Sequence, residues 1–325
     1  MKRKSRKSST RPLKLAGLLT GTAVGGWLLY QSLKPDTVPL PEAIEAQRSS
    51  FSAEPAGQLS YYVDKQQPGR PLLLIHSINA AASSYEIKPL FNHYRISRPV
   101  YALDLPGYGF SERGEQRPYL PKLYSQAIID MLETQVGEPA DVIVMSLSCE
   151  FAARAAVNRP DLFTSLTFIS PAGFNAGPVD LPGESIFPVL NFPLWGQPLF
   201  ELLTVRPSIR YFLQKNFVGA VPEPMVEYAY ATAHQPAARI APFYFLSGQM
   251  FSPDIRPAVY EKLTVPTLVI YDQDPNLSFD KLPDLLAVNS AWQAERVAPS
   301  LGLPHWEMLA ETTAAIDRFW QNGSN

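Results

Sequence analysis

The sequence predicts an α/β fold in which a mostly parallel sheet is covered by helices on both faces. Short apolar runs of strand length alternate with segments of helical periodicity up to about residue 173, and the alternation resumes at about residue 263. The chain has 325 residues, of which 46% are hydrophobic and 18% are charged. It can therefore bury a large core, and it is not a disordered protein.

The N-terminus begins with a basic tail, residues 1–14, which holds seven of the 28 Lys and Arg residues and no acidic residue. An uncharged stretch follows over residues 15–33, and its length suits a transmembrane helix. Because Lys and Arg clusters stay in the cytoplasm, we expect a single-pass membrane protein whose N-terminus is cytoplasmic and whose globular domain is extracytoplasmic. A cleaved signal peptide and a peripheral helix are the alternatives.

Two further expectations concern partners. Gly17, Gly21 and Gly25 recur at every fourth position of the apolar stretch, a spacing that permits a helix-mediated dimer. After residue 14 the chain carries 21 Lys and Arg against 30 Asp and Glu, and this acidic body argues against nucleic acid as a partner. The single cysteine, Cys149, excludes an internal disulfide and a multi-cysteine metal site.

Residues 34–50 are rich in proline and polar residues and are predicted to form a linker. A core domain over residues 51–173 and 263–325 follows. Its strands are expected at residues 61–63, 71–75, 100–103, 142–145, 165–170, 266–271 and 294–298, and its helices at residues 123–135, 148–159 and 311–320. Residues 174–262 are crowded with prolines and aromatic residues, are too long for a loop, and are predicted to form a mostly helical cap inserted into the core.

The apolar strand 142–145 turns directly into a helix, and serines lie at the bend. Such an elbow exposes a side chain at the edge of a sheet and aims the following N–H groups at a reacting oxygen, so it is typical of a nucleophile. The residues two before and two after that nucleophile should be small. We predict Ser148 as the nucleophile, with Ser146 two positions before it and Glu150 two positions after it. Ser146, which has Val144 two positions before it, is the alternative.

The order of these parts resembles the α/β-hydrolase fold family over residues 70 to 320. The run Leu73-Leu74-Ile75-His76-Ser77 is similar to the family's strand ending in His-Gly, and the run Asp104-Leu105-Pro106-Gly107-Tyr108-Gly109-Phe110-Ser111 resembles its D-x-P-G-x-G-x-S segment. The run Leu303-Pro304-His305-Trp306-Glu307-Met308-Leu309 resembles its G-H-W-x-M-L stretch, with Pro304 in place of glycine. The bend itself departs from the family's G-x-S-x-G pattern.

The resemblance implies a catalytic triad in which His305 is the base and an acid after strand 266–271 orients it. Asp274, which precedes Pro275, is the preferred acid, and Asp272 is the alternative. The oxyanion hole is then expected at the backbone N–H groups of Ile78 and Cys149. No metal or organic cofactor is implied.

These expectations together describe a membrane-anchored serine hydrolase that cleaves ester-like or thioester bonds through an acyl-enzyme. The aromatic cap suggests a small hydrophobic acyl substrate. An acyltransferase or other serine-triad chemistry on the same fold is one alternative, and a non-catalytic membrane-bound binding protein is another. Glu150 has no assigned role at this stage.

Overall fold

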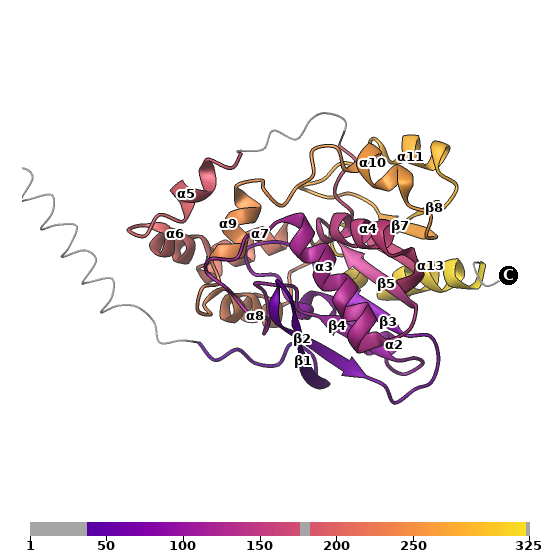
Figure 1. The fold of residues 1–325 in the computed structure, drawn as a ribbon, viewed down its shortest axis with the longest axis horizontal. Coiled ribbons are helices and arrows are strands. Elements are labelled where there is room, and N and C mark those ends of the chain that lie inside the picture. Colours follow the sequence, from indigo (N-terminus) through magenta and orange to yellow (C-terminus); the bar gives the residue numbers. More distant parts are fainter. Residues whose placement is uncertain (1–37, 176–182, 323–325) are drawn as a thin grey trace, which may run out of the picture. The chain divides into compact units, whose positions relative to one another are not determined.

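A sheet of eight strands forms the centre of the computed structural model, which describes residues 38–175 and 183–322 (Figure 1). The strand order is β1-β2-β4-β3-β5-β6-β7-β8. The strands are β1 (Gln47–Ala53), β2 (Gly57–Asp64), β3 (Leu72–Ile75), β4 (Val100–Leu103), β5 (Ala140–Met145), β6 (Phe163–Ile169), β7 (Thr267–Tyr271) and β8 (Trp292–Arg296). Strands β3 to β8 pair in parallel, and β1 and β2 extend the sheet in antiparallel fashion beside β4. The predicted mostly parallel sheet is confirmed.

Helices cover both faces of this sheet, as expected for parallel strands joined by crossovers. The helices that accompany the core are α2 (Lys88–Tyr94), α3 (Pro121–Met131), α4 (Ser148–Asn158), α10 (Ile255–Ala258), α11 (Leu282–Val288), α12 (Pro304–Glu307) and α13 (Leu309–Asn322). Strand β1 begins at Gln47, inside the segment predicted as a linker, so the sheet starts earlier than its sequence pattern indicated.

The central strands are buried on both sides. Every residue of β3, β4 and β5 is buried. Successive side chains of a strand point to opposite faces, so Val142 and Val144 pack in one apolar cluster while Ile143 and Met145 pack in the other. This two-sided burial explains why these strands read as continuous apolar runs in the sequence.

Between β6 and β7 the chain leaves the sheet and forms a cap of short helices (Figure 1). These are α5 (Ile186–Leu190), α6 (Gly196–Leu203), α7 (Arg206–Gln214), α8 (Glu223–Ala233) and α9 (Ile240–Leu246). In the described part of the chain, no helix has the length and apolar character needed to cross a bilayer. The predicted transmembrane segment, residues 15–33, lies outside the described residues.

The Asp104 segment fastens the carboxyl ends of β3 and β4. The Asp104 carboxylate accepts hydrogen bonds from the backbone N–H of Ser84 at 2.9 Å and of Phe110 at 2.9 Å. His76 accepts a bond from the Leu105 N–H at Nε2 (3.0 Å), so its Nδ1 carries the proton and donates to the Ser77 carbonyl at 2.7 Å. These bonds fix the loop that follows β3, which forms one wall of the site described next.

Candidate active site

Ser146 lies at the tip of the bend between β5 and α4. Its φ is 53°, a left-handed conformation that is uncommon for a residue with a side chain. Its N–H donates to the Ile169 carbonyl at 2.9 Å, and its own carbonyl accepts from Cys149 N–H at 3.2 Å. The neighbouring strand and the first turn of α4 therefore hold the backbone in this strained geometry, as a nucleophile elbow requires.

Ser148, the serine preferred from the sequence, does not lie at the tip of the bend. It is the first residue of α4, it is fully buried, and its hydroxyl has no hydrogen-bond partner in the described structure. The strand ends at Met145, so the bend comes one residue later, at Ser146. Val144 stays inside the sheet, and Ser148 supplies the small side chain where the helix begins. The bend is therefore at Ser146, two residues before the predicted Ser148.

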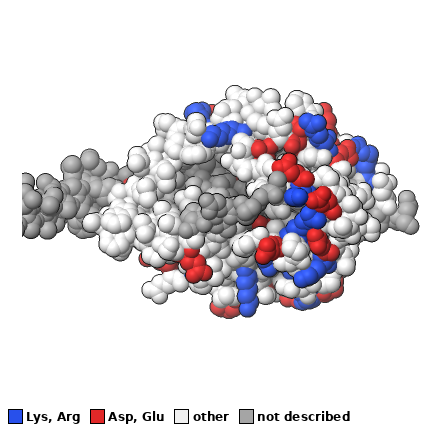
Figure 2. All heavy atoms as spheres, turned by 90° about the horizontal axis from the view of Figure 1, so that it is seen from above, with Lys and Arg blue, Asp and Glu red and all other residues white. Residues whose placement is uncertain are grey.

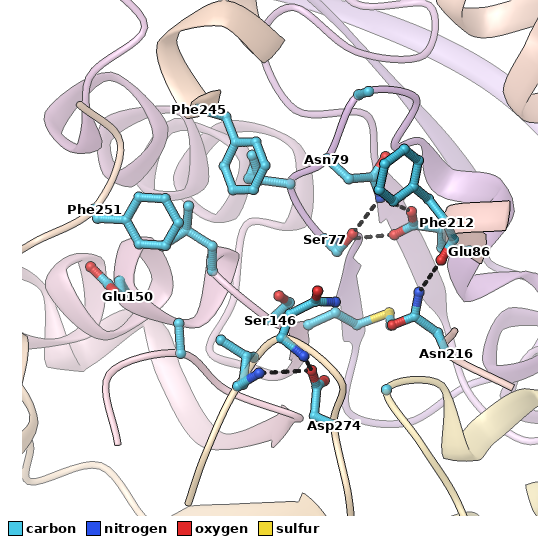
Figure 3. Close-up of a pocket in the computed structure, with 18 of the residues that line it drawn as sticks. Ser77, Asn79, Glu86, Ser146, Glu150, Phe212, Asn216, Phe245, Phe251 and Asp274 are labelled. Atoms are coloured by element: carbon cyan, nitrogen blue, oxygen red, sulfur yellow. Dashed lines mark hydrogen bonds between the residues drawn. The ribbon is translucent and has the colours of Figure 1, made fainter. Parts of the chain in front are cut away.

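A cavity of about 680 Å³ opens between the core and the cap, and Ser146 is part of its wall (Figure 3). Much of the lining is apolar and comes from distant parts of the chain. Apolar side chains that line it include Ile78, Met145, Leu147, Leu203, Ile209, Phe212, Leu213, Met225, Phe245, Leu246, Phe251, Ile255, Leu277 and Leu303. The cap therefore forms a large part of the cavity that faces Ser146.

Two backbone N–H groups beside Ser146 are suited to an oxyanion hole. Ile78 and Leu147 both line the cavity, and neither N–H donates to another group within the described residues. Cys149, the other predicted donor, is fully buried and uses its N–H on the Ser146 carbonyl. Burial also raises the pKa of its thiol, so the thiolate is disfavoured. Among the described residues, the N–H of Leu147, which directly follows Ser146, is free to bind an oxyanion, whereas that of Cys149 is not.

A buried carboxylate organises the loop that carries Ile78. Glu86 accepts from the Ser77 N–H at 3.0 Å and from the Asn79 side-chain amide at 2.7 Å (Figure 3). All three residues line the cavity. This cluster was not among the residues predicted from the sequence, although polar residues just after the carboxyl end of a central strand are a signal that indicates one.

The two candidate acids are separated by the fold. Asp274 lines the cavity, and one of its oxygens, Oδ1, accepts from the backbone N–H groups of Asn276 and Leu277 at 2.8 and 3.0 Å (Figure 3). Burial is the main cause that raises the pKa of Asp274. Asp272 instead bonds Arg296 at 2.6 Å and the N–H of Ser300 at 2.9 Å, and it does not line the cavity.

His305 is not in contact with the cavity. Its ring is fully buried, and Nε2 lies 2.7 Å from the Glu86 carbonyl oxygen, which can only accept, so Nε2 carries the proton. Nδ1 has no partner in the described structure, and burial lowers the pKa of His305 to about 4. No hydrogen bond joins His305 to Ser146 or Asp274, so the predicted triad is not assembled in this conformation.

No other histidine fills this role. The four histidines of the chain all lie in the described ranges, and none of them lines the cavity. The loop that precedes α12 contributes Gly302 and Leu303 to the wall instead. A Cβ at Gly302 would lie 3.0 Å from Asp274 Oδ2, so the backbone of this loop closely approaches the acid. The cavity wall thus holds the strained Ser146 together with the carboxylates of Glu86, Glu150 and Asp274, and with no imidazole.

Glu150, which had no role from the sequence, reaches the cavity from the first turn of α4. Its side chain is almost fully buried and accepts from the N–H of Ser252 at 3.0 Å. Desolvation raises its pKa to about 7. Glu150 thus ties the core helix to the chain that returns from the cap. Among the described residues, no cluster of three or more His, Cys, Asp or Glu could hold a metal ion.

Three comparisons place this architecture among known proteins. Residues 72–315 match the model of the alpha/beta hydrolase family. An uncharacterized hydrolase of Bacillus subtilis, YugF, is 28% identical over 165 residues, which cover 50% of this chain and 55% of YugF. The match thus spans about half the length of that relative.

Solved structures share the fold at low sequence identity. A membrane phospholipase A described as a bacterial virulence factor has a TM-score of 0.69 at 20% identity, covering 96% of this chain and 98% of its own. A meta-cleavage product hydrolase of Pseudomonas fluorescens has a TM-score of 0.66 at 16% identity, covering 85% and 98%. The family model spans most of the chain, so the chain belongs to the alpha/beta hydrolase family, and the predicted family and α/β-fold hydrolase class are confirmed.

Proposed function

We propose that this hydrolase cleaves ester-like or thioester bonds of hydrophobic acyl substrates, with Ser146 as the nucleophile. The observation that carries the proposal is the strained φ of Ser146 at the edge of a largely apolar cavity. Attack of its hydroxyl oxygen on the substrate carbonyl forms the acyl-enzyme and expels the alcohol or thiol, and water then releases the acid. The N–H groups of Ile78 and Leu147 stabilise the oxyanion.

Asp274 is the group we propose to accept the Ser146 proton, directly or through one water molecule. It shares the cavity wall with Ser146, and its Oδ2 accepts no hydrogen bond within the described residues (Figure 3). Its raised pKa makes it a better base than an exposed aspartate. His305, whose Nε2 proton is committed to the Glu86 carbonyl, then serves to hold the loop of Glu86.

A lipid-like acyl chain is the proposed substrate class, because the cavity combines apolar walls with Lys215, a lining cation that is not paired with an acid among the described residues, whereas the lining residues Arg256 and Lys281 both pair with Asp284. Lys215 lines the cavity, lies 4.5 Å from the Tyr211 ring centroid, and forms no ion pair within the described residues. An ammonium group in this place can pair with a phosphate or carboxylate of the substrate. The fold-level likeness to a membrane phospholipase A is consistent with this class.

Membrane attachment is part of the proposal. The uncharged stretch 15–33 behind a basic tail is proposed to anchor the chain, with the tail in the cytoplasm and the catalytic domain on the extracytoplasmic side. A protease added outside intact cells should then remove the catalytic domain. Full protection of the domain in intact cells, with digestion after lysis, would contradict this orientation.

The test of the nucleophile uses a fluorophosphonate probe together with hydrolysis of a short soluble p-nitrophenyl ester. The full chain and its Ser148→Ala variant should label and turn over, whereas Ser146→Ala should do neither, with at least about a 1000-fold loss of rate. Labelling that survives in Ser146→Ala but is lost in Ser148→Ala would restore the sequence-based choice. A folded wild type that neither labels nor hydrolyses any ester would favour the binding-protein alternative.

A further inference from the structure

We propose that the cap rests in the surface of the lipid bilayer through an exposed apolar face, and that this face leads acyl chains into the cavity. The inference rests on the membrane tether and the substrate class proposed above. The cap face is defined by nine apolar side chains on or beside α5, α6 and α7, each at least 40% exposed. These are Val189, Phe192, Leu194, Trp195, Leu202, Val205, Tyr211, Phe212 and Val218.

Helices α5, α6 and α7 bury unusually few of their residues for helices on the surface of a soluble protein. Helix α5 buries none of its residues, α6 buries only Gly196 and Phe200, and α7 buries only Ile209. Leu202 is 68% exposed and Tyr211 is 60% exposed. Single exposed apolar residues are common, but a set gathered on consecutive helices indicates a surface that meets a partner.

The chemistry of the face fits a lipid interface. Residues 185–200 include no charged side chain. On the side of the molecule seen in Figure 2, the end formed by α5 and α6 is nearly free of charge, and most charged side chains gather over the core. Trp195 and Tyr211 are the residue types that favour the boundary between lipid and water. Arg206 and Arg210 of α7 pair with Glu227 and Glu223 of α8, whereas Lys215, just after α7, forms no ion pair within the described residues and can meet a lipid phosphate.

The face continues into the cavity. Phe212 belongs to the cap face and lines the cavity, and the exposed side chains of Leu203 and Leu246 line it as well. An acyl chain can therefore pass from the bilayer to Ser146 along apolar side chains. A second copy of the protein bound to this face would cover Phe212, the side chain that joins the face to the cavity, which favours lipid as the occupant.

The length of the tether keeps the domain near the bilayer. Only residues 34–42 separate the proposed anchor from Ala43 and Ile44, which are fully buried in the domain, and nine extended residues span at most about 30 Å. A domain held at this distance meets the lipid surface at a high effective concentration. Weak apolar contacts of the cap are then sufficient for binding, without a high affinity of their own.

The test measures the depth of a fluorophore on the cap in the full-length protein reconstituted into vesicles of phosphatidylcholine and phosphatidylglycerol. Leu202→Cys carries the label, and Ile96→Cys, where Ile96 is 74% exposed on the core, is the matched control. The native Cys149 is fully buried and does not interfere. We expect doxyl-labelled lipids to quench the label at position 202 at least threefold more than the label at position 96.

Equal quenching at the two positions would overturn the inference. Disulfide-linked dimers of the unlabelled Leu202→Cys protein, together with no quenching of the labelled protein, would assign the face to a second copy and would overturn the inference too. Flotation of the full chain with the vesicles reports the tether separately, so protein that does not float contradicts the proposed anchor. Protein that floats without quenching contradicts only the docking of the cap.

A second measurement uses activity. Leu202→Asp should lower hydrolysis of a vesicle-embedded ester at least tenfold and leave hydrolysis of the soluble p-nitrophenyl ester unchanged, because Leu202 does not line the cavity. Ile96→Asp should change neither rate. If Leu202→Asp hydrolyses the vesicle-embedded ester as fast as the wild type, the docking surface is contradicted. If the wild type hydrolyses neither ester, the proposed hydrolysis is contradicted instead.

Discussion

In the sheet, β3, β4 and β5 bury every side chain, whereas in the cap α5 buries none and α7 buries only Ile209. Both regions are rich in apolar residues, so composition does not distinguish them. The difference is what covers them: the core strands have helices on both faces, whereas one face of the outer cap helices is not covered by any of the residues that the structure describes. Apolar residues therefore stabilise the fold in the core, while those of the cap face are available for binding.

The largest expected effect is on stability and compares one leucine from each region. Leu74 is fully buried in the sheet, so Leu74→Ala should lower the free energy of unfolding by about 2–5 kcal/mol. Leu202 is 68% exposed, so Leu202→Ala should change it by less than about 0.5 kcal/mol. Urea unfolding of the full chain measures both. A large loss in Leu202→Ala would show that the cap face is structural.

Glu150 joins the two regions and should make their contact depend on pH. Its folded pKa of about 7 exceeds the ordinary value of about 4.3, so the folded state holds one more proton between these values. The free energy of unfolding should thus fall by up to about 4 kcal/mol as the pH rises from about 4.3 to 7, and stay low above that.

Glu150→Gln tests this dependence, because the amide keeps the shape of the side chain and does not titrate. The unfolding free energy of the variant, measured at pH 5 and at pH 8, should change less between the two pH values than that of the wild type. The same slope in both proteins would mean that Glu150 is not the titrating group.

Substitution of Asp274 tests whether hydrolysis of a soluble ester depends on a core residue and not on the cap face. Asp274→Asn should lower the rate on a soluble ester at least about 100-fold. Because burial raises the pKa of Asp274, the wild-type rate should fall as the pH drops through a value above that of an exposed aspartate. His305→Gln, which keeps an N–H for the Glu86 carbonyl, is the control. Loss of the acidic limb in His305→Gln instead would identify the imidazole as the base.

The smallest expected effect concerns Ser148. Its buried hydroxyl has no partner in the described structure, and a buried unpaired polar group is unfavourable. Ser148→Ala should therefore leave the free energy of unfolding unchanged or raise it by up to about 1 kcal/mol, as measured in urea. A clear loss of stability would show that the hydroxyl makes a bond in solution.

The fold was predictable because alternating apolar runs and helical segments report burial directly. The elbow was harder to predict. The G-x-S-x-G pattern requires small residues two positions from the nucleophile, and Val144, two positions before Ser146, seemed too large. The conformation that decides the matter, the φ of 53° at Ser146, is a property of the backbone. The end of the apolar run at Met145 was the better guide.

The histidine could not be placed from the sequence for a different reason. The motif around His305 fixes its position along the chain, but a short helix turns the ring toward the Glu86 carbonyl and leaves Gly302 and Leu303 at the cavity. Such a rotation depends on contacts between residues more than 200 positions apart. The exposure of the cap face likewise depends on which elements pack against it, and the sequence alone does not show that packing.

The backbone of Ser146 has a consequence for how this protein changes over time. A side chain in the left-handed region costs about 1–2 kcal/mol, which glycine would avoid. Selection for stability alone would therefore replace this serine, and any descendant that no longer needs the proposed nucleophile should drift toward glycine there. A serine is therefore expected to persist at this position only while a function requires its side chain.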